Sequence, residues 1–128
     1  SESMYNRPPF PGPALAARVI GELTPERIAV VRQATAIVEE ERKGTPAFQG
    51  MAILHEDRVT GMREGKRAYG LQIEIRSWES KDARVATPTR LSYDILEQLR
   101  ERITVEISSV VCETYNITKK PPSTMEVV

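Results

Sequence analysis

Leu71-Gln72-Ile73-Glu74-Ile75-Arg76 is the stretch of this sequence that decides the fold. Three aliphatic side chains alternate with three polar ones, which is the pattern of a β-strand with one apolar face and one face in water. Residues 48–54 and 59–62 are predicted to form two strands before it, and the Glu64-Gly65-Lys66 turn leads into it. Val110-Val111 and residues 115–117 indicate a last strand. The sequence therefore predicts a small antiparallel sheet.

Two helices flank this sheet in the sequence. The first has Thr24 as N-cap, Pro25 at its first helical position and Gly44 to end it. The second carries apolar residues at strict four-residue steps, namely Leu91, Ile95, Leu99 and Ile103. The fold class predicted is α+β, with two helices packed on one face of the small antiparallel sheet.

Composition favours a single ordinary globular domain. The 128 residues are 40% hydrophobic and 28% charged, and 18 basic residues balance 18 acidic ones. A balanced charge provides no field to attract nucleic acid or an acidic membrane, and no apolar run approaches the roughly 18 residues of a membrane span. Cys112 is the only cysteine, which excludes an intrachain disulfide. We expect one cytoplasmic domain over residues 1–128, with residues 1–6 as an irregular lead-in and no membrane or nucleic-acid partner.

Two proline-pinned loops each carry a cation, Arg7 in residues 7–14 and Lys120 in residues 120–126. Proline stiffens a loop, and a cation held on a stiff loop suits an anion contact. The alternatives are a stiff entry segment for the first loop and a frayed tail with solvated lysines for the second. Pro8 to Pro11 also matches a polyproline ligand, a pattern that is common by chance.

Catalytic and metal-binding patterns are mostly missing from the sequence. There is no glycine-rich phosphate loop and no nucleophile elbow. His55-Glu56-Asp57-Arg58 has groups that bind metals, but it is more typical of a solvated turn at the end of a strand. Cys112 is expected to be a small, partly buried residue rather than a nucleophile, and Trp78 to pack rather than stack on a ligand. We predict no catalytic residue and no metal site.

Several motifs in order resemble the C-terminal dimerisation domain of GMP synthetase, the amidotransferase that converts XMP to GMP. In that family the domain opens with Arg-His-Pro-Phe-Pro-Gly-Pro-Gly-Leu-Ala and closes with Lys-Pro-Pro-(Ala/Gly)-Thr-Ile-Glu-Trp-Glu. The matching stretches here are residues 7–16 and 120–128, and the interior match includes residues 18–27, Phe48-Gln49 and residues 90–96. The resemblance covers nearly the whole chain, from about residue 5 onward.

The resemblance implies a part of a ligase that is not catalytic by itself. Such a domain joins two subunits and helps to hold XMP, by positions that correspond here to Gln49, Lys120, Met125, Glu126 and Arg7. It implies residues 119–128 as a ligand-contacting loop, a homodimer, and an ATP-pyrophosphatase domain or subunit as partner. No cofactor is implied for this chain, because ATP and Mg²⁺ belong to the ATP-pyrophosphatase domain, whose phosphate loop this sequence lacks.

The departures from the family pattern keep other functions open. An arginine eight residues before the loop lysine, which reaches the phosphate across the dimer in this family, is Cys112 here. Losing it removes a charge-assisted hydrogen bond, on the order of 1.5–3 kcal/mol. We expect the chain to be a fragment or a separate subunit of a GMP synthetase, or else a stand-alone divergent paralogue. A paralogue would act as a non-catalytic nucleotide-binding module or as a purely structural dimer module.

Overall fold

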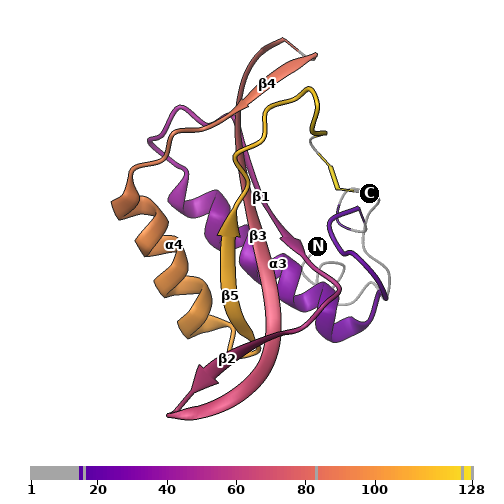
Figure 1. Ribbon diagram of the computed structural model, residues 1–128. Helices are drawn as coiled ribbons and strands as arrows, with labels where there is room; N and C mark the ends of the chain where they lie inside the picture. Colours follow the sequence, from indigo (N-terminus) through magenta and orange to yellow (C-terminus); the bar gives the residue numbers. More distant parts are fainter. Residues whose placement is uncertain (1–14, 16, 83, 125, 128) are drawn as a thin grey trace, which may run out of the picture.

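The structure is a computed structural model that describes residues 15, 17–82, 84–124, 126 and 127, the side chains of 80–82 excepted. These residues form two helices and five strands (Figure 1). In chain order the elements are α3 (Pro25–Glu41), β1 (Gln49–Leu54), β2 (Val59–Arg63), β3 (Lys66–Asp82), β4 (Val85–Pro88), α4 (Tyr93–Glu106) and β5 (Val110–Tyr115). The α+β prediction is confirmed.

The long strand β3 is the centre of the sheet, because all four other strands pair with it. Strands β1, β2 and β4 run antiparallel to β3, whereas β5 runs parallel to it along residues 71–75. The sheet is thus mostly antiparallel, whereas the sequence predicts a wholly antiparallel one. The reason is the connection: α4 carries the chain back along the sheet after β4, so that β5 starts at the same end as β3.

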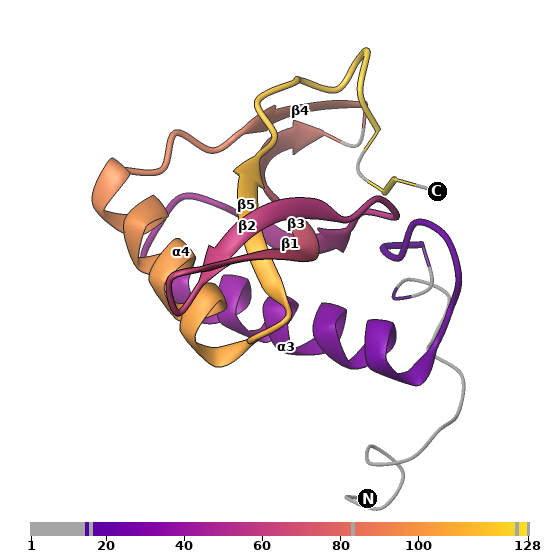
Figure 2. The same cartoon turned by 60° about the horizontal axis from the view of Figure 1, so that its bottom comes forward.

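Both helices lie on one face of the sheet, as predicted (Figure 2). The Thr24 hydroxyl accepts the Arg27 N–H at 3.2 Å, and Ser92 caps α4 in the same way through the Ile95 N–H at 3.2 Å. Helix α4 therefore begins after Leu91, which packs against the core from outside the helix. The helices and the sheet share an aliphatic core that includes Val31, Ala34, Ile37, Val38, Ala52, Leu54, Ile73, Ile75, Leu99 and Ile103.

The other face of β3, which carries Gln72, Glu74 and Arg76 and is called the polar face below, is not in water. Glu74 is 8% exposed and Arg76 is 6% exposed, so the predicted wet face is wrong. The chain after β5 crosses this face on the side away from the helices (Figure 2). A second apolar cluster of Met51, Ile53, Trp78 and Ala86 lies on the same side, which confirms the packing role expected for Trp78.

One strand was not expected. Strand β4 is only four residues long and pairs with the end of β3, a length too short for a pattern to show. No helix among the described residues is long and apolar enough to cross a membrane.

Only glycine fits at position 70, because Val111 and the Ser109 carbonyl approach its Cα closely. The variant Gly70→Ala tests this packing. A Cβ there would lie 2.5 Å from Cγ1 and 2.8 Å from Cγ2 of Val111, and 2.9 Å from the Ser109 carbonyl oxygen. We expect a loss of about 1–3 kcal/mol in the free energy of unfolding, measured by urea denaturation. Adding Val111→Ala should restore part of this loss, because it removes both Cγ atoms but not the Ser109 contact. Strictly additive effects in the double variant would contradict the packing account.

Candidate functional site

The C-terminal segment, defined as the described residues between 116 and 127, is fixed to the sheet at its middle. Lys120 forms a β-bridge with Ala86 of β4, in which the Lys120 N–H donates to the Ala86 carbonyl at 2.9 Å and the reverse bond is 3.2 Å. The Ser123 N–H donates to the Lys119 carbonyl at 2.9 Å and closes the turn, and the Lys120–Pro121 and Pro121–Pro122 peptides are cis. The backbone of the predicted anion-binding lysine is therefore held in one place, half-buried beside β4.

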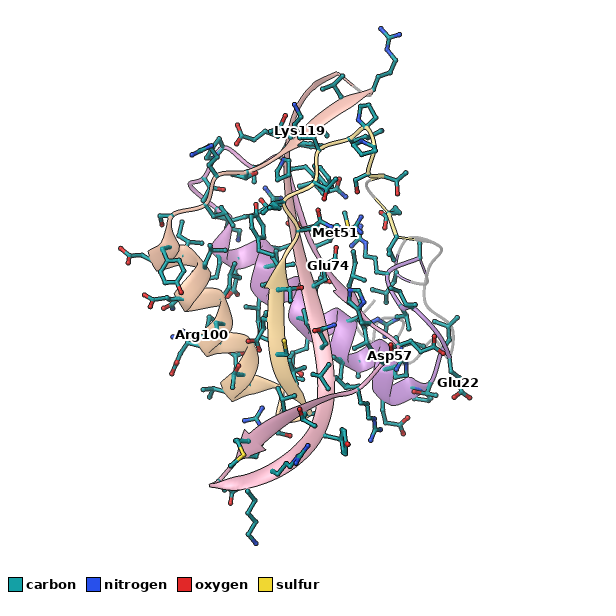
Figure 3. All side chains as sticks on the ribbon, viewed as in Figure 1. Glu22, Met51, Asp57, Glu74, Arg100 and Lys119 are labelled. Carbon is teal, nitrogen blue, oxygen red and sulfur yellow. The ribbon has the colours of Figure 1, made fainter. Side chains whose placement is uncertain are left out.

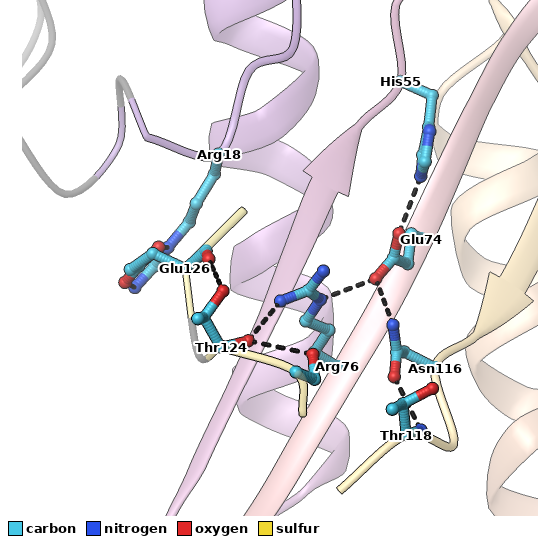
Figure 4. A network of polar contacts seen from close by, with 9 residues as sticks. Arg18, His55, Glu74, Arg76, Asn116, Thr118, Thr124 and Glu126 are labelled. Atoms are coloured by element: carbon cyan, nitrogen blue, oxygen red, sulfur yellow. Dashed lines mark hydrogen bonds and ion pairs between the residues drawn. The ribbon is translucent and has the colours of Figure 1, made fainter. Parts of the chain in front are cut away.

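A buried polar network on the polar face holds both ends of this segment (Figure 4). Glu74 is at its centre: Oε1 lies 2.7 Å from His55 Nε2, and Oε2 accepts from Arg76 Nε at 2.5 Å and from Asn116 Nδ2 at 2.9 Å. Arg76 Nη1 donates to the Thr124 carbonyl at 2.7 Å. One carboxylate thus connects the start of the segment at Asn116 with its far end at Thr124.

The electrostatics of Glu74 follow from these contacts. Burial acts to raise the pKa of its carboxyl group, since a charge loses solvation there. The hydrogen bonds from Arg76, His55 and Asn116 outweigh burial, so that the pKa of Glu74 lies below its usual value. Glu74 is therefore an anion at neutral pH, and Arg76 is its counter-charge.

A second contact holds the last described residues. Arg18 donates from Nε and Nη2 to the two carboxylate oxygens of Glu126, each at 3.2 Å. The Thr124 hydroxyl donates to the Glu126 carbonyl at 2.7 Å. The Glu126 side chain is thus engaged within the chain, so a ligand contact at this position would fall to the main chain.

The structure places the predicted ligand residues at one end of the sheet but not side by side. Gln49 begins β1 opposite Trp78 of β3, whereas Lys120 lies beyond β4. Three inter-strand steps separate their backbones, roughly 14 Å along the sheet. Lys119, next to Lys120, lies at the β4 end of the molecule, far from Glu22 and Asp57 (Figure 3). Arg7 and Met125 lie outside the described residues.

Cys112 and His55 have structural contacts. Cys112 is half-buried, its Sγ lies 3.5 Å from Gln72 Oε1, and burial raises the pKa of the thiol, which disfavours a nucleophilic thiolate. His55 is more than part of a solvated turn, since its Nε2 lies 2.7 Å from Glu74 Oε1. Among the described residues no three side chains of the metal-binding types are grouped to hold an ion.

Sequence reasoning missed the role of Glu74, Arg76 and Asn116. The available signal was the opposite charge of Glu74 and Arg76 two positions apart, which puts both on the same face of the strand. Only the crossing of the C-terminal segment turns that face into an interior.

Two clefts lie outside the network, whose residues line neither of them. One of about 630 Å³ lies at the end of the sheet away from Lys120, and its lining mixes basic and acidic side chains, including Arg27, Arg58, Arg63, Glu22 and Glu56. The other, of about 550 Å³, lies beside the C-terminal segment and is lined by residues that include Pro88, Arg90, Leu91, Ile117 and Lys119. The second cleft combines apolar surface with two cationic side chains, Arg90 and Lys119, and lies next to the β-bridge between Lys120 and Ala86.

Comparison with known proteins identifies the family. The family model described as GMP synthase C terminal domain matches residues 33–127. This chain therefore belongs to the GMP synthase C-terminal domain family, and the predicted resemblance is confirmed.

The relatives are longer proteins. One subunit of the glutamine-hydrolysing GMP synthase of Thermococcus kodakarensis is 45% identical over 127 residues, which cover 98% of this chain and 41% of that protein. The corresponding subunit of Methanopyrus kandleri is 40% identical over 132 residues, with 98% and 42% covered. The glutamine-hydrolysing GMP synthase of Pyrobaculum aerophilum is 45% identical over 129 residues, with 98% and 26% covered. The chain thus spans less than half the length of each of these relatives.

Glu74→Gln tests the network. We expect the free energy of unfolding at pH 7 to fall by about 1.5–3 kcal/mol, because a neutral amide leaves Arg76 buried without its counter-charge. Since the folded-state pKa of Glu74 lies below the unfolded value, its contribution is present above that value and is lost as pH falls through the folded pKa. The difference between the wild type and Glu74→Gln should therefore shrink from about pH 5 downward, as measured by urea denaturation across pH.

Glu113→Gln is the matched control. Burial raises the pKa of Glu113, although the Thr104 hydroxyl donates to it at 2.7 Å. The contribution of Glu113 to stability is thus present at low pH and lost as pH rises. The stability of the wild type relative to Glu113→Gln should therefore rise as pH falls, whereas its stability relative to Glu74→Gln should fall. The same pH dependence for both variants would contradict the charge assignment of Glu74.

Proposed function

We propose that this chain is the dimer-forming and XMP-phosphate-binding part of a GMP synthase, with no chemical step of its own. The observation that carries the proposal is the match of residues 33–127 to the GMP synthase C-terminal domain. The relatives that share this region are glutamine-hydrolysing GMP synthases or single subunits of them, and the region is a minor part of each. XMP amination, with its need for ATP and Mg²⁺, would then take place on an ATP-pyrophosphatase domain or subunit acting as partner in the cytoplasm.

Lys120 is the residue best suited to the phosphate. Its ammonium group is a compact cation with three donors, which suits contact with several phosphate oxygens. Its backbone is fixed between β4 and the Pro121-Pro122 pair, so little backbone conformational entropy remains to be lost on binding. Gln49, Arg7 and the main chain at Met125 and Glu126 are the further contacts that the family pattern implies.

Cys112 is the specific observation that favours a second candidate, a structural dimer module that has lost its ligand. The residue lies on the polar face beside Gln72, where the family pattern has an arginine that reaches the partner's phosphate. The two candidates differ in whether XMP binds at all, which the following measurement decides.

Lys120→Ala is expected to weaken XMP binding about tenfold or more, since a charge-assisted phosphate contact contributes over roughly 1.4 kcal/mol. Isothermal titration calorimetry of XMP into the purified chain measures this. Lys43→Ala is the matched control, because Lys43 is an exposed lysine between α3 and β1 and removes the same charge elsewhere.

Cys112→Arg is the converse variant and should tighten XMP binding, provided that the dimer brings this position to the partner's site. Absence of XMP binding by the wild type and by Cys112→Arg would reject the ligand-binding proposal in favour of the structural module. Equal effects of Lys120→Ala and Lys43→Ala would show that Lys120 contributes only net charge.

A homodimer is the predicted assembly. Several large apolar side chains remain exposed, among them Ile117 at 80% and Tyr93 at 70%, and Ile117 lines the cleft beside the C-terminal segment. Two-fold pairing of identical chains is the commonest way to cover such a surface. Light scattering at tens of micromolar should give twice the mass of the 14.4 kDa chain. A monomer at that concentration would contradict the prediction, and Ile117→Glu should lower the dimer fraction if this surface is the interface.

A further inference from the structure

We infer that Arg76, oriented by Glu74, is a positioning residue for nucleotide binding. It fixes the backbone of the C-terminal segment, called the loop below, which carries the proposed phosphate contacts. The inference rests on the proposed function, since the loop is a ligand site only if XMP binds there. It adds two residues of β3 that need not touch the ligand themselves.

The guanidinium of Arg76 fixes the direction of the bonds that it donates. Arg76 donates through Nε to Glu74 at 2.5 Å and through Nη1 to the Thr124 carbonyl at 2.7 Å. Both nitrogens belong to one rigid plane, so fixing one bond fixes the direction of the other. Thr124 directly precedes the Met125–Glu126 main chain that the family pattern assigns to the ligand.

Glu74, together with Arg76, anchors the chain on both sides of Lys120. Asn116 donates to the same Oε2 that binds Arg76, and Asn116 Oδ1 in turn accepts the Thr118 N–H at 2.8 Å. The loop is therefore held at Asn116 before Lys120 and at Thr124 after it (Figure 4). The Glu74–Arg76 pair therefore limits movement to the residues between these two ties, and within them the β-bridge to Ala86 holds Lys120.

The Glu74–Arg76 ion pair is buried, which affects its free energy. Removing two charges from water is costly, and a well-packed apolar pair of the same size is often as stabilising as a buried ion pair. The Glu74–Arg76 pair, with side chains 10% and 7% exposed, is thus a poor means of stabilising a sheet but an effective means of orienting a backbone carbonyl. The Arg18–Glu126 pair is more exposed, at 14% and 34%, so solvent screens it more and it holds the loop less firmly.

The test uses Arg76→Met and Arg76→Lys in the full chain. Met removes the donors and the charge. Lys keeps a cation beside Glu74 but lacks the planar fork that reaches Thr124 at the same time. Arg102→Met is the matched control, because Arg102 also makes several ion pairs, with Glu40, Glu41 and Glu106, all remote from the loop.

Two readouts separate the inference from the proposed function. The first is amide hydrogen exchange without ligand at Lys120 and Ser123, whose N–H groups bond to Ala86 and Lys119, with Ile73 in β3 as internal reference. The second is XMP affinity by calorimetry. We expect exchange at Lys120 and Ser123 to accelerate about tenfold or more in both Arg76 variants relative to Ile73, and XMP affinity to fall by a similar factor. Arg102→Met should change neither.

Each outcome decides the inference. Unchanged loop exchange in a folded Arg76 variant overturns it, as does equal acceleration at Lys120 and Ile73, which would indicate general destabilisation. If Arg76→Met fails to fold, Arg76→Lys decides. Accelerated loop exchange with unchanged XMP affinity overturns the positioning role. If the wild type binds no XMP, the proposed function fails and the ligand role of Arg76 fails with it, while the exchange data still report whether Arg76 anchors the loop.

Discussion

The structure depends on β3, the strand with which all four other strands pair. This central strand is buried on both faces, and its side chains alternate between the two buried faces. Leu71, Ile73 and Ile75 face the helices and the main core. Glu74 and Arg76 point the opposite way, into a space that the end of the chain closes. Burying this second face is possible only because each of its charges meets an opposite charge or a hydrogen-bond partner there.

The polar interior links distant parts of the chain. His55 follows β1, Glu74 and Arg76 belong to β3, and Asn116 and Thr124 come from the C-terminal segment, yet hydrogen bonds join all five residues. Such a network confers order at a specific place, because each bond has a direction, whereas apolar packing would tolerate sliding. A segment that presents a cation to a phosphate benefits from that difference, since binding then costs little further ordering.

The chain belongs to the GMP synthase C-terminal domain family. In the proposed function the helices and the apolar face of the sheet stabilise the domain, and the polar face holds the loop that meets XMP. Cys112 shows where the chain departs from the family pattern: it lies on the polar face at 3.5 Å from Gln72, close to the network but outside it. In the proposed function this departure bears on ligand contact across a dimer and not on how the loop is held.

Both helices, the Thr24 cap of α3, four of the five strands and the family could be predicted from the sequence, because periodicity, capping and motif order are local properties of the chain. The parallel pairing of β5 with β3, the existence of β4 and the burial of Glu74 and Arg76 came from the three-dimensional arrangement alone. The physical reason is that period-two alternation distinguishes two faces of a strand but does not say what covers each one. Thr124 lies 48 residues from Arg76 along the chain, and a contact at that separation leaves no trace in local spacing.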